Sequence, residues 1–314
     1  MTKFVSPVSP ISQVSRVLQI SEISFRRIWV LLVNTVQKEY YNRSLIFLFV
    51  FTLLVIYLDH RLFNFLNNSF SLFSSLSPSP VSSPVVNLVK TKFSVFYVFV
   101  SIWSIIISII LGAGIVRSDM SMQVISQILS WPITRAEFLL GRIFGAWSMV
   151  LAYYLLMSVF AVVLFAGDTF SSDGWTLLGM CTYLGRMGLA FFYCSLVMIP
   201  IITLGVLLSL YFAKAWAGIL TSIITALIFN ANHTFASKET FMELFDSLSS
   251  IGDYFYLAMH YLLPRLGVYL EIGQKIFFSS ELSLGYCLVQ TVHFIFAYLL
   301  LLLLLIYFFR RKEF

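Results

Sequence analysis

The sequence predicts an all-α, polytopic membrane protein with six transmembrane helices, and two observations carry this prediction. Hydrophobic residues make up 60% of the 314 positions and charged residues only 11%, against roughly 25% charged residues in soluble domains. Several apolar runs are long enough to cross a bilayer core of about 30 Å as helices. We expect a single transmembrane domain over residues 1–314, made of a loosely ordered tail (1–24), an interfacial helix (25–43) and a six-span bundle (44–314).

The helix expected over residues 25–43 cannot cross the bilayer, because its apolar run covers only residues 28–33. Basic residues at both ends, together with Trp29 and Tyr40, are typical of a helix that lies in the membrane interface. A cytoplasmic extension of the first span is the alternative interpretation. The first span itself, residues 44–58, is short for a helix that crosses a bilayer.

Five longer apolar runs predict the second to sixth spans. Serines and prolines in residues 67–92 predict a loop outside the bilayer before the second span, because proline interrupts a helix. The segment 231–281 holds six acidic residues and broken apolar stretches, which favours short interfacial or re-entrant helices. The second to sixth spans are expected at residues 93–116, 138–165, 187–212, 216–230 and 282–309.

The distribution of basic residues predicts the orientation. Six spans place both termini on the same side of the membrane. Of the 20 Lys and Arg residues, thirteen fall on the side of the termini and seven on the other side. Cytoplasmic loops carry the excess of Lys and Arg in membrane proteins. We therefore expect both termini in the cytoplasm.

The sequence contains no recognisable catalytic, cofactor or metal-ligand pattern. Its four histidines are far apart, and it lacks a Gly-x-Ser-x-Gly nucleophile turn and a Gly-x-x-x-x-Gly-Lys-Ser/Thr phosphate loop. Its basic residues lie mainly beside span ends, which does not suit nucleic acid. We therefore predict that the protein is not an enzyme, needs no cofactor or metal, and has membrane lipid but no nucleic acid among its partners.

Two residues within the predicted spans are candidates for the transport pathway or for gating. Pro200 lies near the middle of the fourth span, where a proline usually kinks the helix. His293 is an ionisable group inside the sixth span, which is a functional candidate by default. The alternatives are an ordinary kink at Pro200 and, for His293, a hydrogen bond to a carbonyl of a neighbouring helix. Acidic residues are almost absent from the apolar cores, so any energy source for transport is expected outside this chain.

The polar segment 117–142 separates the second span from the third and has a helical pattern. Ser118 is a plausible N-cap and Asp119 would lie in the first turn of the helix that follows. Gln123 and Gln127 fall on its polar side. Its apolar side is expected from the spacing of three and four residues between Met122, Ile125, Ile128 and Leu129.

Pro132 is expected to end this amphipathic helix, because the residue before a proline avoids the helical region. Thr134 and Glu137 then have the spacing of a capping box, in which each side chain bonds the backbone N–H of the other residue. The segment therefore predicts a short amphipathic helix, a corner at Pro132, and a new helix that enters the bilayer.

The stretch ILSWPITRAEFLLGR, residues 128–142, resembles the region after the second span in ABC transporter permeases of type 2. That family typically shows Leu-Leu-Ser-x-Pro-Ile-Ser/Thr-Arg-x-Glu-Phe-x-Leu-Gly-Lys. This chain departs from the family just before the stretch, where Gln123 and Val124 replace Gly-Thr. The matching residues are Leu129, Ser130, Pro132, Ile133, Thr134, Arg135, Glu137, Phe138, Leu140 and Gly141, with Arg142 in place of Lys.

Looser features agree with the resemblance, which covers most of the chain in layout. Residues 38–47 resemble the family's approach to its first span, the six-span order with a long fifth connection matches, and the chain ends in FFRRKEF. The layout is nearest to the branch of multicopper-enzyme maturation and gliding-type permeases. The resemblance implies a multi-pass protein of a bacterial inner or plasma membrane.

The resemblance also implies a function. The chain would be the membrane subunit of an ATP-binding cassette transporter, an exporter, that pairs with a second permease chain in a homo- or heterodimer. The segment 117–137 would be a coupling helix on a separate ATPase subunit, and residues 25–43 an elbow helix. A solvated face is the alternative at each position of the coupling segment. The implied ATPase contacts are Arg117, Asp119, Gln123, Gln127, Leu129, Pro132, Arg135 and Glu137.

A second function from a different class stays open, namely a non-transporting membrane scaffold that recruits cytoplasmic partners. Transport by reconstituted vesicles that depends on ATP and on a partner ATPase would distinguish the two. The composition of the spans does not identify the substrate.

Overall fold

The computed structural model describes residues 25–40, 50–54, 57–58, 61, 84–121, 133–170, 177–235, 251–277 and 284–312. Within these ranges all regular structure is helical, with no strand. The helices are α2 (Phe25–Tyr40), α4 (Pro84–Ser121), α6 (Arg135–Phe170), α7 (Leu177–Ser209), α8 (Lys214–Phe235), α10 (Ile251–Leu262), α11 (Leu266–Phe277) and α12 (Leu284–Arg311).

Five of these helices are long and apolar enough to cross a membrane, and they coincide with the predicted second to sixth spans. The first predicted span, residues 44–58, lies mostly outside the described residues, which include only helical residues 50–54 and 57–58 of it. The candidate spans are Phe96–Met120, Arg135–Met157, Gly185–Ser209, Lys214–Ala231 and Gly285–Arg311.

The bundle is built around α7. In its candidate span 72% of the residues are buried, against 28% in those of α8 and α12, so α8 and α12 leave broad apolar faces uncovered. α4 and α7 cross in backbone contact, because a Cβ at Gly112 would lie 2.7 Å from the carbonyl oxygen of Ile202, and one at Gly205 would lie 3.0 Å from Gly112 Cα. Glycine is needed on both helices for this approach.

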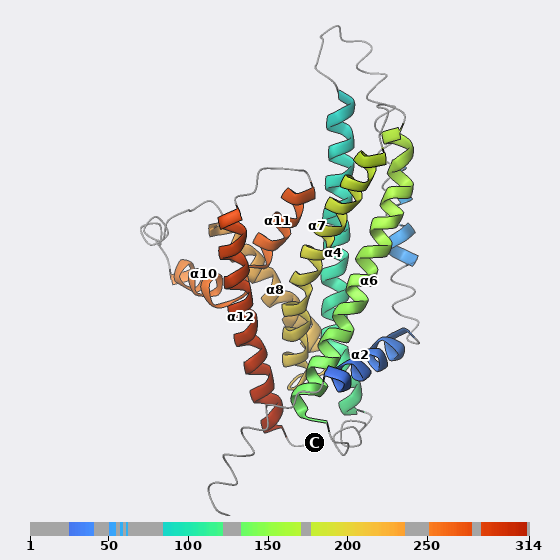
Figure 1. Cartoon of the computed structure of the whole chain (residues 1–314). Coiled ribbons are helices and arrows are strands. Elements are labelled where there is room, and N and C mark those ends of the chain that lie inside the picture. Colours follow the sequence, from blue (N-terminus) through green and yellow to red (C-terminus); the bar gives the residue numbers. More distant parts are fainter. Residues whose placement is uncertain are drawn as a thin grey trace, which may run out of the picture.

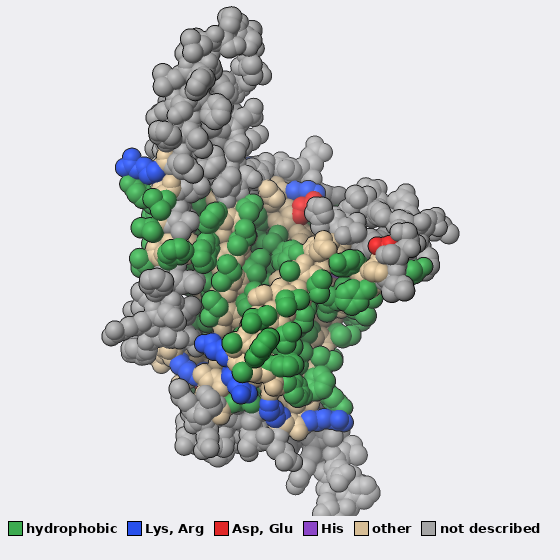
Figure 2. Space-filling view, turned by 180° about the vertical axis from the view of Figure 1, so that it is seen from behind, with side chains coloured by type: hydrophobic (Ala, Val, Ile, Leu, Met, Phe, Trp, Pro, Cys, Tyr) green, Lys and Arg blue, Asp and Glu red, His purple; other side chains and the backbone are tan. Residues whose placement is uncertain are grey.

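The ends of all five candidate spans meet at one end of the bundle, which we call the basic end. α4, α7 and α12 finish there, α6 and α8 begin there, and α2 lies across the lower part of α6 (Figure 1). In Figure 2, Lys and Arg side chains gather along the border of the hydrophobic face. The described basic residues of this end are Arg26, Arg27, Lys38, Arg117, Arg135, Arg142, Lys214, Arg310, Arg311 and Lys312.

The N-terminal end of α4 corrects one prediction. A loop is expected up to residue 92, but α4 begins at Pro84 and its first turns extend beyond the neighbouring helices (Figure 1). Proline is well tolerated in the first helical turn, because the N–H that it lacks would have no partner there. The next proline is Pro132, so nothing in the following residues stops the helix.

The other end of α4 corrects a second prediction. Ser118 is expected to be the N-cap of a new helix, but α4 continues through it to Ser121. The Ser118 hydroxyl donates to the carbonyl of Ile115 at 3.2 Å, as a residue inside a helix can. The segment from 117 to 121 contains no glycine or proline that would end the preceding helix. Residues 122–132, where the rest of the amphipathic helix is predicted, lie outside the described residues.

The segment between the fifth and sixth spans contains short helices, as the sequence predicts. α10 and α11 have 12 residues each. They are separated at Pro264, whose carbonyl accepts a hydrogen bond of 2.9 Å from Leu266 N. Pro264 and Leu263 line a small gap together with Pro200 of α7, so the break between the two short helices packs against the proline of the central helix.

Candidate functional site

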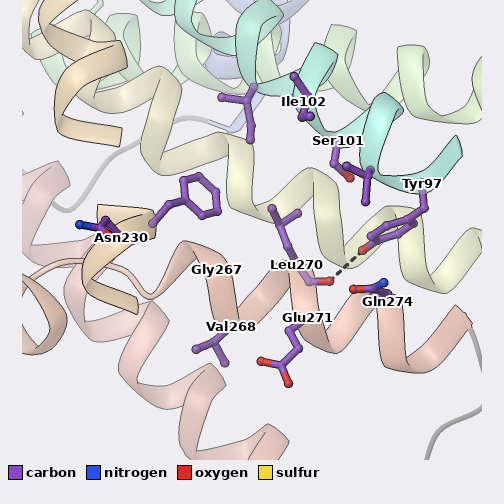
Figure 3. Close-up of a pocket in the computed structure, with 12 residues that line it drawn as sticks. Tyr97, Ser101, Ile102, Asn230, Gly267, Val268, Leu270, Glu271 and Gln274 are labelled. Atoms are coloured by element: carbon purple, nitrogen blue, oxygen red, sulfur yellow. Dashed lines mark hydrogen bonds between the residues drawn. The ribbon is translucent and has the colours of Figure 1, made fainter. Parts of the chain in front are cut away.

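An open, largely apolar groove lies between α4 and α8, with α11 as its floor (Figure 3). Its volume is about 630 Å³, within the range of roughly 300–1,000 Å³ typical of ligand pockets. Val98 and Ile102 of α4 are 46% and 51% exposed, so this wall of the groove is open to its surroundings. The polar lining residues are Tyr97, Ser101, Asn230, Glu271 and Gln274.

Tyr97 fixes the floor of this groove. Its hydroxyl donates to the carbonyl of Leu270 on α11 at 2.9 Å and lies 2.6 Å from Cys194 Sγ on α7. α11 can approach this pair only because position 273 is glycine, since a Cβ at Gly273 would lie 2.5 Å from Tyr97 Oη. Tyr97 thus joins α4, α7 and α11 in one buried contact, which holds α11 against the bundle.

The groove has a second section of about 600 Å³ nearer the basic end. Here α4 contributes apolar residues such as Ile106 and Ile110, and α8 contributes Gly218, Ile219 and Lys214. Lys214 is the first residue of α8, so its ammonium group stands at the basic end of an otherwise apolar channel. The face between α4 and α8 is therefore hollowed over much of the length of the two helices.

A buried charge cluster lies at the basic end, on α2, α4 and α6. Asp119 of α4, 2% exposed, accepts a hydrogen bond of 2.5 Å from Lys38 Nζ of α2. Its second oxygen lies 2.7 Å from Arg142 Nη2 of α6, an ion-pair contact without hydrogen-bond geometry. Lys38 also donates to Ser118 at 2.7 Å, and Arg142 donates to Thr35 at 2.9 Å. We call Lys38, Asp119 and Arg142 the Asp119 cluster.

The position of Asp119 explains why it needs two cations. It lies in the last turn of α4, where the partial negative charge of the helix end disfavours a carboxylate. Burial adds a desolvation cost, which an ion offsets only with close, well-placed partners. Lys38 and Arg142 supply them from two other helices, so the cluster ties the end of α4 to α2 and α6.

Two glycines four residues apart allow α2 to lie directly on α6. A Cβ at Gly141 would lie 2.5 Å from Leu31 Cβ, and one at Gly145 would lie 2.6 Å from Thr35 Cβ. Residues four apart share one face of a helix, so the two glycines form a flat strip for α2. Arg142 follows the first glycine and reaches Thr35 beside the strip.

The predicted capping box at the start of α6 is confirmed. Thr134 N donates to Glu137 Oε2 at 2.7 Å, and Glu137 N donates to Thr134 Oγ1 at 3.2 Å. Glu137 is fully buried, and Arg27 of α2 lies 3.8 Å from its other oxygen. The box thus also connects the start of α6 with α2.

Arg135, a predicted ATPase contact, is bound within the chain to the end of α12. Its Nη1 donates to the carbonyls of Phe309, Arg310 and Lys312 at 3.2, 2.7 and 3.0 Å. The last carbonyls of a helix have no partner inside the helix, so Arg135 acts as a C-cap for α12.

The remaining predicted coupling residues have different locations. Gln123, Gln127, Leu129 and Pro132 lie outside the described residues. Arg117 is partly exposed near Lys312, whose pKa is lowered by burial and then by the positive charge of Arg117. Asp119 and Glu137 are buried, at 2% and 0% exposure. Three of the predicted coupling residues bind other residues of this chain, namely Asp119, Arg135 and Glu137.

The two pathway candidates are separate from the groove section in Figure 3. Pro200 is buried inside α7. His293 Nε2 lies 2.9 Å from the carbonyl oxygen of Tyr261 on α10. This contact matches the alternative interpretation of His293, a hydrogen bond to a carbonyl of a neighbouring helix. Close by, Arg265 donates to Gln290 at 3.2 Å. Burial and then the charge of Arg265 lower the pKa of His260 to about 4, so this histidine of α10 is neutral at physiological pH.

Sequence patterns do not single out Lys38, Lys214 or Glu271. In the sequence Lys38 is one of several basic residues and begins the stretch 38–47 of the family resemblance, but neither pattern indicates its partner Asp119, which is 81 positions away. The four-residue spacing of Gly141 and Gly145 around Arg142 is a signal that could have indicated the helix crossing. Lys214 and Glu271 have no local motif, because the groove forms only when α4, α8 and α11 come together.

Among the described residues, no group of three or more His, Cys, Asp or Glu side chains could hold a metal ion. No protein-family model matches the chain, and no curated protein matches it significantly. Its function must therefore be argued from its own residues and their geometry.

Proposed function

We propose that this chain is the membrane subunit of an ATP-binding cassette exporter, driven by a separate ATPase that docks on residues 117–137. The translocation pathway would run along the groove section shown in Figure 3, and a second permease chain would complete it there. Both termini would lie in the cytoplasm of a bacterial inner or plasma membrane. The sequence of residues 128–142 is the starting point of this proposal.

The observation that carries the proposal is that α4 connects the proposed docking segment with the groove. Its end at Asp119 is bound to α2 and α6, directly before the proposed docking segment. Its exposed face, with Val98 and Ile102, lines the groove. With 38 residues, a straight helix is about 57 Å long at roughly 1.5 Å per residue. A displacement of the docking segment could therefore reach the groove through a single rigid element.

The contacts at the basic end suggest how the force would be shared. The Asp119 cluster joins α4 to α2 and α6, and Arg135 joins the start of α6 to the end of α12. The docking segment would thus push on several helices at once when two ATPase subunits close on ATP. In this role Asp119 and Glu137 act as positioning residues, because their side chains are buried, and the surface that meets the ATPase would come from other residues of the segment.

Co-purification with the ATPase tests the proposal. The first step is to establish whether a neighbouring gene encodes a P-loop ATPase. The chain would then be co-expressed with that candidate ATPase, and the complex captured from detergent extracts. We expect Leu129→Asp to insert into the membrane normally but to lose most of the bound ATPase, because a charge would replace an apolar residue of the docking face. Lys275→Gln, on α11, is the matched control and should retain the ATPase.

Equal retention of the ATPase by Leu129→Asp and Lys275→Gln would overturn the docking role of the segment. A scaffold that only recruits partners would bind the ATPase but would show no ATP-dependent transport in vesicles that contain both proteins. Since the cargo is not identified, ATPase activity stimulated by the membrane subunit is measured first.

A further inference from the structure

The groove section nearest the basic end has an uncommon combination of features. Its walls are apolar, with Ile106, Ile109 and Ile110 on α4 and Ile219 on α8, and its volume is about 600 Å³. Its only charged lining residue is Lys214. No described Asp or Glu carboxylate forms an ion pair with Lys214. Within the described residues, Lys214 thus presents a cation at the end of an apolar channel without a carboxylate partner.

Small residues keep this channel open and place the ammonium group. A Cβ at Gly218 would meet only Ala113 Cβ, at 3.9 Å, so the space in front of Gly218 is empty. The Lys214 side chain lies over Gly114, where an added Cβ would be 3.2 Å from Nζ. Any larger residue at position 114 would push the ammonium group away from α4.

The length and position of the channel match one membrane leaflet. Lys214 and Ser222 mark its extent along α8, about 12 Å at roughly 1.5 Å per residue. Half of a bilayer core is about 15 Å thick. Lys214 is the first residue of a candidate span, which is the level of the lipid headgroups, and the isoleucines lie at the level of the acyl chains.

The surroundings of Lys214 favour a negatively charged headgroup. Lys312 lies near the same end, with Nζ 5.2 Å from the centre of the Tyr211 ring in the turn before α8. Arg117 lies close enough to Lys312 to lower its pKa. Several cations at one end of the bundle raise the local concentration of anions and attract anionic lipids. A zwitterionic headgroup would gain less from this potential.

We propose that this channel binds an anionic phospholipid of the inner leaflet. One acyl chain lies between Ile110 and Ile219, and the phosphate group binds the Lys214 ammonium. Long basic side chains commonly reach the headgroup level in this way while their aliphatic stems stay in apolar surroundings. The site depends on neither the ATPase nor transport, so it can exist whether or not the chain belongs to an exporter.

A nearby tryptophan, Trp216, serves as the probe, because it is 62% exposed and directly follows Ala215, which lines the channel. The purified full-length chain would be reconstituted in vesicles of phosphatidylcholine that contain brominated phosphatidylglycerol, or the reverse. Bromine quenches tryptophan fluorescence on contact, and the difference from Trp216→Phe isolates the signal of Trp216. We expect a several-fold preference for phosphatidylglycerol over phosphatidylcholine.

Three variants of the channel and one control variant decide the cause of that preference. Lys214→Gln should bring it close to one, whereas Lys214→Arg should keep it. Gly218→Leu should lower it by filling the channel, and its side chain has room, so folding is preserved. Lys275→Gln removes a lysine from the opposite end of the bundle and should leave the preference unchanged.

An equal response to both lipids in the unmodified chain would overturn the proposal, as would a full preference in Lys214→Gln. Protection of Trp216 from both lipids, with cross-links between copies, would also overturn it, because a second chain would then fill the channel. None of these results would affect ATPase binding, so the proposed transporter function is tested separately.

Discussion

The surroundings of Asp119 differ from those that its local sequence predicts. Its place in the polar segment predicts an exposed carboxylate in a first helical turn, but it is buried in a last turn between two cations. The carboxylate is tolerated because Lys38 and Arg142 offset both its desolvation and the unfavourable helix end. Removing a cation should therefore cost more than removing the whole cluster.

We expect Arg142→Met to destabilise the chain by about 3 kcal/mol, because breaking a buried ion pair leaves one charge poorly compensated. The double variant Asp119→Leu with Arg142→Met should cost less than this single change, since Lys38 is 31% exposed and can be solvated alone. Denaturation midpoints in detergent micelles measure both values. Additive costs in the double variant would show that the two residues do not act together.

The capping box of Thr134 and Glu137 could be predicted, and the partners of Asp119 could not. The box depends on residues three positions apart, so a local rule contains everything that it needs. The partner of Lys38 is 81 positions away, and only the docking of α2 on α6 brings the two together. Pairing of this kind belongs to the tertiary structure.

At the scale of elements, the contact between α2 and α6 depends on shape more than on charge. The strip formed by Gly141 and Gly145 allows α2 to lie against the α6 backbone. Other faces of α2 stay open, with Phe25 79% and Trp29 55% exposed. A helix with one face on the bundle and another on its surroundings suits the membrane interface.

A matched pair of glycine variants tests this contact. In Gly145→Ala the new Cβ would meet Thr35 Cβ at 2.6 Å, so α2 must shift, at a cost of about 1–3 kcal/mol for overpacking. In Gly188→Ala the new Cβ has no neighbour within 4 Å, and the change should be neutral or slightly stabilising. Hydrogen exchange of residues 25–40 should increase only in Gly145→Ala. Equal exchange in both variants would contradict the crossing.

The sequence predicts the apolar core of each described span well and the ends of its helix poorly. Hydropathy marks the part of a helix that meets lipid, but α4 begins at Pro84 and ends at Ser121, well beyond the predicted 93–116. Polar residues continue a helix when no proline or glycine stops it. The groove is also unpredictable from local patterns, because it needs α4, α8 and α11 at their final distances.

At the scale of the whole molecule, the two ends of the bundle differ in their charged residues. The basic end holds the Asp119 cluster, Arg135 and the first residue of α8, and the opposite end holds the Glu271–Lys275 pair, 2.7 Å apart. Hydrophobic side chains cover the face between these ends (Figure 2). Under the positive-inside rule this excess of basic residues favours a cytoplasmic location for the basic end, which is the orientation that we propose.

Labelling with a membrane-impermeant maleimide tests this orientation in intact cells. In a background with Cys181, Cys194 and Cys287 replaced by alanine, Lys275→Cys should be labelled from outside. Arg311→Cys should be labelled only after the membrane is permeabilised. The opposite result would invert the topology and move the segment 117–137 out of reach of a cytoplasmic ATPase.

The three hydrogen bonds of Arg135 have a practical consequence for work with this protein. The backbone carbonyls of Phe309, Arg310 and Lys312 bind the first residue of α6, so residues 309–312 belong to the folded body. Shortening the chain before Phe309 would leave the guanidinium without its acceptors and loosen the start of α6. An affinity tag at the C-terminus should follow a flexible spacer.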